Sequence, residues 1–200
     1  MVVHLPVEPT ASAPALRLRP WQPQDAGALA LAHQDPLLRR RLMTFLEDEA
    51  AARRWIDAQA AGWAAGIRFA FAVEEPAATE EHTDTVDTAV NVLSGPTTPL
   101  LGHIVVREGT GPAEGAAEVG YWTAAGARGR GIAPRALDTV SRWALGPQCP
   151  LPLTWIALLH SRSNEASCRV AEKGGYELRT VLPPYPPQFP EEGHLHVRSA

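Results

Sequence analysis

The stretch from Glu118 to Leu137 constrains the fold of this chain more than any other part of its sequence. It reads EVGYWTAAGARGRGIAPRAL, and the apolar and aromatic residues over 118–123 are typical of a strand packed in a sheet. Small, glycine-rich residues over 124–131 are typical of a tight turn, and apolar residues recur at helical spacing from Ile132 onward. The sequence therefore predicts a strand, a glycine-rich turn and a helix, with the turn at the amino terminus of the helix.

Such a turn is suited to hold a phosphate group. The first N–H groups of a helix lack intrahelical partners and carry the positive end of the helix dipole. Gly129 and Gly131 leave the backbone accessible, and the side chains of Arg128, Arg130 and Arg135 add positive charge. From these residues alone, a plain strand–helix turn with solvated arginines remains the alternative.

Length and composition limit the class of protein. A chain of 200 residues, 45% hydrophobic and 20% charged, suits one globular domain, which we place at residues 15–200. No apolar run is long enough to span a membrane. The first residues do not show the basic region and apolar core of a signal peptide, so a cytoplasmic protein is expected. Cys149 and Cys168 make no disulfide framework and are expected to be reduced. A net charge of −4 argues against nucleic acid as a partner.

The remaining pattern predicts further elements. Strands are expected at 16–21, 69–73, 100–106, 117–123, 153–159, 176–182 and 194–198. Helices are expected from 25 to 31 with a short second piece at 37–42, and over 49–65, 132–146 and 164–173. The segment 1–14 contains several prolines among small residues, which favours a flexible arm. Residues 75–99 are interpreted as a mobile insertion between strands.

Two segments resemble a known family. The run from Arg128 to Ala133 is similar to the Arg/Gln-x-x-Gly-x-Gly/Ala signature of the GNAT superfamily of acyl-CoA N-acyltransferases, and Gly120 to Trp122 resembles its RimJ/RimL branch. The segment from Asn164 to Tyr176 resembles the family's Asn-x-x-Ser-x-x-Val-x-x-Lys-x-Gly-Phe/Tyr motif. The resemblance implies an α/β fold with a mixed sheet, in the order β-α-α-β-β-β-α-β-α-β-β, and an N-acetyltransferase that uses acetyl-CoA as co-substrate, without a metal.

The resemblance also implies how acetyl-CoA is bound. Its pyrophosphate is expected on Arg128, Gly129, Arg130, Gly131, Ile132 and Ala133. The pantetheine arm is expected along the backbone of Trp122 and Thr123, with Asn164 bonding its amides. A backbone N–H between Tyr121 and Thr123 is expected to polarise the thioester carbonyl. Pro134 departs from the family pattern because it offers neither an N–H nor a hydroxyl to the phosphates.

Two side chains are candidates for proton transfer. Glu118 resembles the strand glutamate that serves as general base in several family members, and a structural glutamate paired with an arginine is the alternative. Many members carry a proton-donating tyrosine where Ala171 stands here. Ser167 matches the serine of the RimJ/RimL branch and is the expected acid, with packing in the capping turn as its alternative.

The sequence predicts less about the acceptor substrate than about the acetyl donor. The resemblance implies a primary amine, either a protein N-terminal α-amine or a small molecule, held between the early helices and the loop over 183–193. In that loop Tyr185 and Phe189 are candidate pocket walls, and a solvated loop is the alternative. A catalytically idle acyl-CoA-binding module is the competing function, and a homodimer is compatible with the sequence.

The histidines show no convincing metal-ligand spacing. His194 and His196 place two imidazoles on one strand face, but packing in the core or at the sheet edge is the favoured reading of both, and no metal site is predicted.

Overall fold

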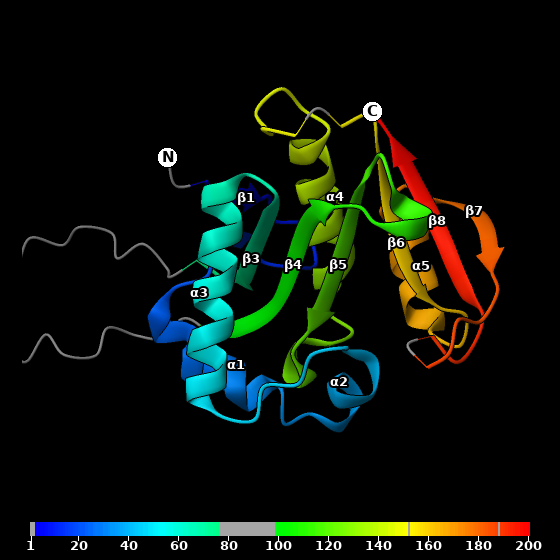
Figure 1. The fold of residues 1–200 in the computed structure, drawn as a ribbon. Coiled ribbons are helices and arrows are strands. Elements are labelled where there is room, and N and C mark those ends of the chain that lie inside the picture. Colours follow the sequence, from blue (N-terminus) through cyan, green and yellow to red (C-terminus); the bar gives the residue numbers. More distant parts are fainter. Residues whose placement is uncertain (1–2, 77–98, 152, 188) are drawn as a thin grey trace, which may run out of the picture.

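In the part of the chain that the structure describes, eight strands form one mixed sheet with helices on both faces (Figure 1). The computed structural model describes residues 3–76, 99–151, 153–187 and 189–200. The strands are β1 (Leu5–Val7), β2 (Leu16–Pro20), β3 (Arg68–Glu74), β4 (Leu100–Glu108), β5 (Ala117–Thr123), β6 (Trp155–Ser161), β7 (Glu177–Leu182) and β8 (Gly193–Ser199). The helices are α1 (Ala26–Ala32), α2 (Pro36–Arg41), α3 (Glu49–Ala65), α4 (Ile132–Ala144) and α5 (Glu165–Lys173).

The strand order is β1-β2-β3-β4-β5-β6-β8-β7, and every neighbouring pair is antiparallel except β5 and β6. A parallel pair needs a crossover connection, which here contains α4. The β5–β6 ladder covers only residues 117–119 opposite 156–158, although β5 continues to Thr123 and β6 to Ser161. The two strands therefore diverge at their carboxyl ends.

Helices pack on the two faces of the sheet because alternate strand residues point to opposite sides. One apolar core lies between the sheet and α4 and α5, and includes Ile104, Val119 and Leu137. A second lies beneath α1, α2 and α3, and includes Ile56 and Trp122. In the described part of the chain, no helix is both long and apolar enough to cross a membrane.

Most predicted elements are confirmed, and the differences have local causes. The expected loose arm over 1–14 is wrong for residues 5–7, because Leu5 and Val7 are buried and β1 pairs with β2 at the sheet edge. The strand predicted from residue 153 begins at Trp155, since Leu153 lies in a turn where its N–H bonds Leu151. The insertion predicted over 75–99 falls almost wholly on residues 77–98, which lie outside the described residues.

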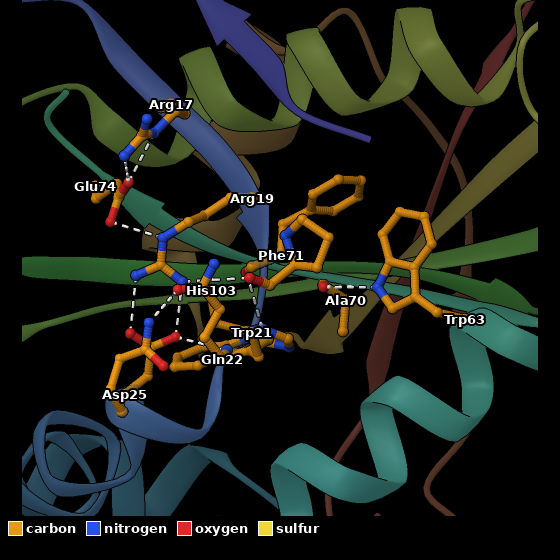
Figure 2. Close-up of polar contacts among 12 residues, drawn as sticks. Arg17, Arg19, Trp21, Gln22, Asp25, Trp63, Ala70, Phe71, Glu74 and His103 are labelled. Atoms are coloured by element: carbon orange, nitrogen blue, oxygen red, sulfur yellow. Dashed lines mark hydrogen bonds and ion pairs between the residues drawn. The ribbon is translucent and has the colours of Figure 1, made fainter. Parts of the chain in front are cut away.

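A buried charged network joins β2 to β3 (Figure 2). The Arg19 guanidinium donates to both carboxylate oxygens of Asp25, at 2.7 and 2.8 Å, and to Glu74 Oε2 at 2.8 Å. Arg17 donates to the other oxygen of Glu74, whose side chain is only 2% exposed. Asp25 also accepts the backbone N–H of Gln22. It thus fixes the turn before α1 through Arg19 and makes no side-chain capping bond to that helix.

Candidate active site

The divergence of β5 and β6 opens the sheet at one end. Beyond Val119 the ladder to β6 stops, while β5 stays paired with β4 through Thr123. Within the described chain, the edge of β5 that faces β6 therefore has no strand partner over residues 120–123. Ligands of open α/β sheets bind outside the carboxyl ends of strands, where the order of connections changes. The predicted backbone positions at Tyr121, Trp122 and Thr123 lie along this edge.

The glycine-rich turn follows directly and presents backbone N–H groups. Gly129 and Gly131 have φ values of +75° and +70°, in the left-handed region that residues with a Cβ rarely adopt. Gly131 is the N-cap of α4 and has no side chain that could accept from the first N–H groups of the helix. Among the described residues, the backbone N–H groups over 129–133 make no hydrogen bond to another backbone group. These donors, with the dipole of α4 behind them, have the arrangement that favours binding of an anion.

The arginines of this turn are held by the protein itself. Arg128 pairs with Asp35, the N-cap of α2, and Arg130 pairs with Glu75. Arg135 donates to the backbone carbonyl oxygens of Glu8 and Pro14, at 2.7 and 2.8 Å. The side chains of Arg128 and Arg130 are therefore engaged by carboxylates, whereas the backbone N–H groups of the turn make no hydrogen bond to a described residue.

The start of α5 brings the predicted acid beneath the divergence. Asn164 is the N-cap of α5, and its side-chain oxygen accepts the N–H of Ser167 at 3.4 Å. Burial raises the pKa of Tyr121 to about 12, and the nearby Ser167 hydroxyl opposes that rise in part. The Tyr121 hydroxyl is buried and makes no hydrogen bond of ordinary geometry to a described residue. A neutral phenol therefore lies next to Ser167, a position of the Tyr121 side chain that the sequence did not predict.

Glu118 lies on the opposite face of β5. Its carboxylate accepts from Arg107 at 2.7 Å, and the two residues face each other directly in the β4–β5 ladder. This is the structural arrangement that the sequence left open beside the role of general base. A surface pocket lined by Arg68, Arg107 and residues 108–111 lies at this amino-terminal end of β5, away from the divergence.

His33 is a functional candidate that sequence reasoning missed. It is the C-cap of α1, is buried, and packs edge-on against Trp122 with ring centroids 5.9 Å apart. Burial lowers the pKa of His33, and its Nε2 has no hydrogen-bond partner among the described residues. The imidazole is therefore neutral at physiological pH and can accept a proton. Nothing in the local sequence marks it, because its contact with Trp122 joins the end of α1 to β5, which are distant in sequence.

The elements expected around an acceptor do meet. Arg41 of α2 donates to the Ser163 hydroxyl at 3.3 Å, and Ser163 donates to Glu191 in the loop before β8 at 2.8 Å. Tyr185 and Phe189 are 70% and 56% exposed and are joined by backbone hydrogen bonds at the tip of that loop. The exposure of the two rings fits the solvated loop that the sequence offered as the alternative to a pocket wall.

Comparison with known proteins gives one family and many similar folds. The model of the acetyltransferase (GNAT) domain family matches residues 15–177. No curated protein matches the sequence significantly.

Three solved structures illustrate the similarity of fold. The microcin C7 self-immunity acetyltransferase MccE, in complex with acetyl-CoA and AMP, has a TM-score of 0.72 at 13% identity, covering 96% of this chain and 98% of its own. Mycobacterium smegmatis RimJ, in complex with CoA-disulfide, has a TM-score of 0.71 at 18% identity, covering 100% and 87%. A Salmonella typhimurium acetyltransferase that modifies the N-terminal serine of ribosomal protein L7/L12 has a TM-score of 0.71 at 15% identity, covering 99% of both chains.

Proposed function

The chain belongs to the GNAT acetyltransferase family, and on that premise we propose that it transfers an acetyl group from acetyl-CoA to a primary amine. The observation that carries this proposal is the early end of the β5–β6 ladder beside the free N–H groups at the start of α4. An extended pantetheine arm can occupy the unpaired edge of β5, while the pyrophosphate accepts from the turn. MccE, solved with acetyl-CoA and AMP, and RimJ, solved with CoA-disulfide, support the choice of donor.

The proposed binding residues fall into three groups. The pyrophosphate is assigned to the turn residues Arg128, Gly129, Arg130, Gly131, Ile132 and Ala133, with the backbone as the main donor. The pantetheine amides are assigned to the backbone of Trp122 and Thr123 and to Asn164. Pro134 lies in the first turn of α4 and contributes no N–H, so phosphate binding rests on fewer donors than the helix would otherwise offer.

The reaction needs stabilisation of an oxyanion and a proton for the departing thiolate. We assign the oxyanion to a backbone N–H between Tyr121 and Thr123, which lie past the end of the ladder. We assign the proton to Ser167 with the Tyr121 phenol beside it. Because burial raises the pKa of Tyr121 to about 12, the phenol keeps its proton and can supply it through Ser167.

The attacking amine must be neutral, and two groups are proposed to take its proton. Glu118, acting through water, is the base that the family resemblance suggests. His33 is the base that the geometry suggests, because its neutral imidazole packs on Trp122 at the carboxyl end of β5. The acceptor is proposed to be a protein N-terminal α-amine or a small-molecule amine, approaching past α2 and the turn at Ser163.

The test is CoA release from acetyl-CoA in the presence of short peptides with different N-termini, polyamines and aminoglycosides. Turnover with one class would support the enzyme and identify its acceptor. If acetyl-CoA raises the melting temperature but no acceptor is turned over, the chain behaves as an idle acyl-CoA-binding module. If acetyl-CoA neither shifts the melting temperature nor is consumed, the donor site itself is wrong.

Matched variants separate the proposed bases. If Glu118 is the base, Glu118→Gln lowers kcat by at least about tenfold whereas Arg107→Gln, which breaks the same ion pair, does not. If the two variants lower kcat equally, Glu118 has a structural role and is not the base.

If His33 is the base, His33→Gln removes the acidic limb of the pH–rate profile. That limb lies below pH 6.5 in the wild type because burial lowers the pKa of His33. Ser167→Ala is expected to lower kcat with little change in KM.

A further inference from the structure

Three imidazoles and one thiol meet on the α5 side of the sheet. His160 lies on β6 directly opposite His194 of β8, and His196 lies opposite Leu158. Side chains that face each other across a ladder, and residues two apart on one strand, share a face of the sheet. All three imidazoles therefore point toward α5, which places the Cys168 thiol above them.

The distances within this histidine–cysteine cluster are short. The four ligand atoms all lie within 4.8 Å of one another. Cys168 Sγ lies 3.2 Å from His194 Nδ1 and 3.7 Å from His160 Nε2. Zinc–nitrogen bonds of about 2.0–2.1 Å and zinc–sulfur bonds of about 2.3 Å put neighbouring ligands of a tetrahedral ion roughly 3.3–3.6 Å apart. Small side-chain rotations would bring the four atoms to that spacing.

The orientation of His160 is that of a metal ligand. Its Nδ1 lies 2.9 Å from the backbone carbonyl oxygen of Ser161, to which it can donate. That bond leaves the lone pair on Nε2, the atom that faces Cys168. Histidine ligands of metals usually donate their second ring N–H to a carbonyl or carboxylate in this way, which fixes the tautomer.

Packing alone does not account for His196. Its exposed fraction is 2%, and neither ring nitrogen makes a hydrogen bond of ordinary geometry within the described part of the chain. Two orphaned polar atoms in a buried ring cost free energy that an apolar residue would avoid.

We propose that His160, Cys168, His194 and His196 bind one zinc ion. Three nitrogens and one thiolate match the ligand preference of Zn²⁺, and four protein ligands complete a tetrahedron, as in structural zinc sites. Binding releases the thiol proton of Cys168, because the thiolate is the ligand. The ion joins β6, β8 and α5, and so fixes the helix whose first turn carries Asn164 and Ser167. This inference does not depend on acetyl transfer.

The test uses the full-length protein stripped of metal with a chelator. Zinc uptake is measured by competition with a chromophoric chelator, and Co²⁺ is added separately as a spectroscopic probe. We expect one zinc per chain, a higher melting temperature on loading, and a tetrahedral Co²⁺ spectrum with a thiolate-to-cobalt charge-transfer band. His194→Ala and Cys168→Ser are expected to weaken zinc binding at least about tenfold. Cys149→Ser, which alters the other cysteine, and His4→Ala, which alters an exposed histidine, are expected to leave it unchanged.

Two results would overturn the proposal. One is the absence of stoichiometric uptake by the folded wild type. The other is uptake that persists in both His194→Ala and Cys168→Ser, which would place the ion elsewhere. If either variant fails to fold, as circular dichroism would reveal, the wild-type Co²⁺ spectrum still decides. A spectrum without a thiolate band excludes Cys168 as a ligand and with it this site.

Discussion

The charged network between β2 and β3 and the histidine–cysteine cluster between β6, β8 and α5 each contain a fully buried polar side chain, Glu74 in the first and His196 in the second, but only the first is satisfied by its neighbours. Arg19 is bonded to Asp25 and Glu74, and both oxygens of Glu74 are bonded to arginines. In the cluster, by contrast, both ring nitrogens of His196 lack hydrogen-bond partners among the described residues. A buried polar group without a partner is costly, so its persistence points to a ligand that completes it.

The region around β5 differs from the region around β2 and β3 in the same way, because it contains further polar groups without hydrogen-bond partners among the residues that the structure describes. Unsatisfied polar groups of the described chain include the Tyr121 hydroxyl and His33 Nε2, which lie on β5 and against it, and the N–H groups over 129–133. All of these surround the carboxyl end of β5. The β2–β3 region is therefore interpreted as scaffold, and the region around β5, β6 and α5 as the part of the molecule that binds ligands. Four predictions test this division.

The largest effect is expected in the scaffold. Glu74→Ala removes the buried carboxylate that accepts hydrogen bonds from Arg17 and Arg19. It should lower the free energy of unfolding by about 3–5 kcal/mol, as for a broken buried ion pair. Glu75→Ala, next along the chain, removes a more exposed partner of Arg130 and should cost at most about 1 kcal/mol. Urea denaturation measures both. Equal losses would contradict the structural importance of the network.

The next effect is a dependence of stability on pH. His103 Nδ1 lies 3.1 Å from Trp21 Nε1 and 3.2 Å from the Phe71 carbonyl oxygen, and the ring is buried (Figure 2). Burial, assisted by the charge of Arg68, lowers the pKa of His103 to about 3. Since the unfolded chain binds this proton near pH 6.5, stability falls as the pH drops below 6.5 and the loss is complete near pH 3.

Between pH 6.5 and 4 the loss through His103 is roughly 3 kcal/mol. His103→Gln should remove that part of the slope, whatever its effect at pH 7. Unfolding free energies of both proteins across this range give the comparison. Parallel curves for the two proteins would show that His103 does not carry the dependence.

A smaller effect is expected on ligand binding at the turn. Gly131→Val forces a β-branched residue into φ +70° and should weaken acetyl-CoA binding at least about tenfold, or 1.4 kcal/mol, by displacing the backbone donors. Gly126→Ala is the control in the same connection, because a Cβ there meets nothing within 4 Å and φ is not positive. Calorimetric titration measures both, and unchanged affinity in Gly131→Val would remove the turn from the donor site.

The smallest effect separates two tyrosines on the same side of the sheet. Tyr176→Phe breaks a 2.6 Å hydrogen bond to the Ser141 hydroxyl and should cost about 1 kcal/mol of stability. Tyr121→Phe removes a hydroxyl that makes no hydrogen bond of ordinary geometry to a described residue and should change stability by less than about 0.5 kcal/mol. The same Tyr121 variant should lower kcat. A loss of stability in Tyr121→Phe as large as that in Tyr176→Phe would mean that its hydroxyl is satisfied.

Local sequence patterns predicted much of this molecule because their causes are local. Glycines that adopt positive φ, helical apolar spacing after Ile132 and an Asn cap at Asn164 act within one or two turns of chain. These features placed the strand, the turn, α4 and α5 nearly as the structure has them.

Features that depend on contacts distant in sequence were missed. The pairing of Arg128 with Asp35 joins α2 to the glycine turn, and the meeting of His160, Cys168 and His194 depends on the register of β6 with β8. No spacing within one segment encodes such contacts. The proline-containing start hid β1 for a related reason, since the strand is held by its pairing with β2.

Amide hydrogen exchange with and without acetyl-CoA tests the central claim most directly, because it reports where on the chain the ligand is bound. We predict slower exchange in peptides covering 120–133 and the start of α5, with no change in β2 and β3. Protection confined to other segments, or none at saturating acetyl-CoA, would contradict the assignment of the β5–β6 divergence and the α4 turn as the donor site.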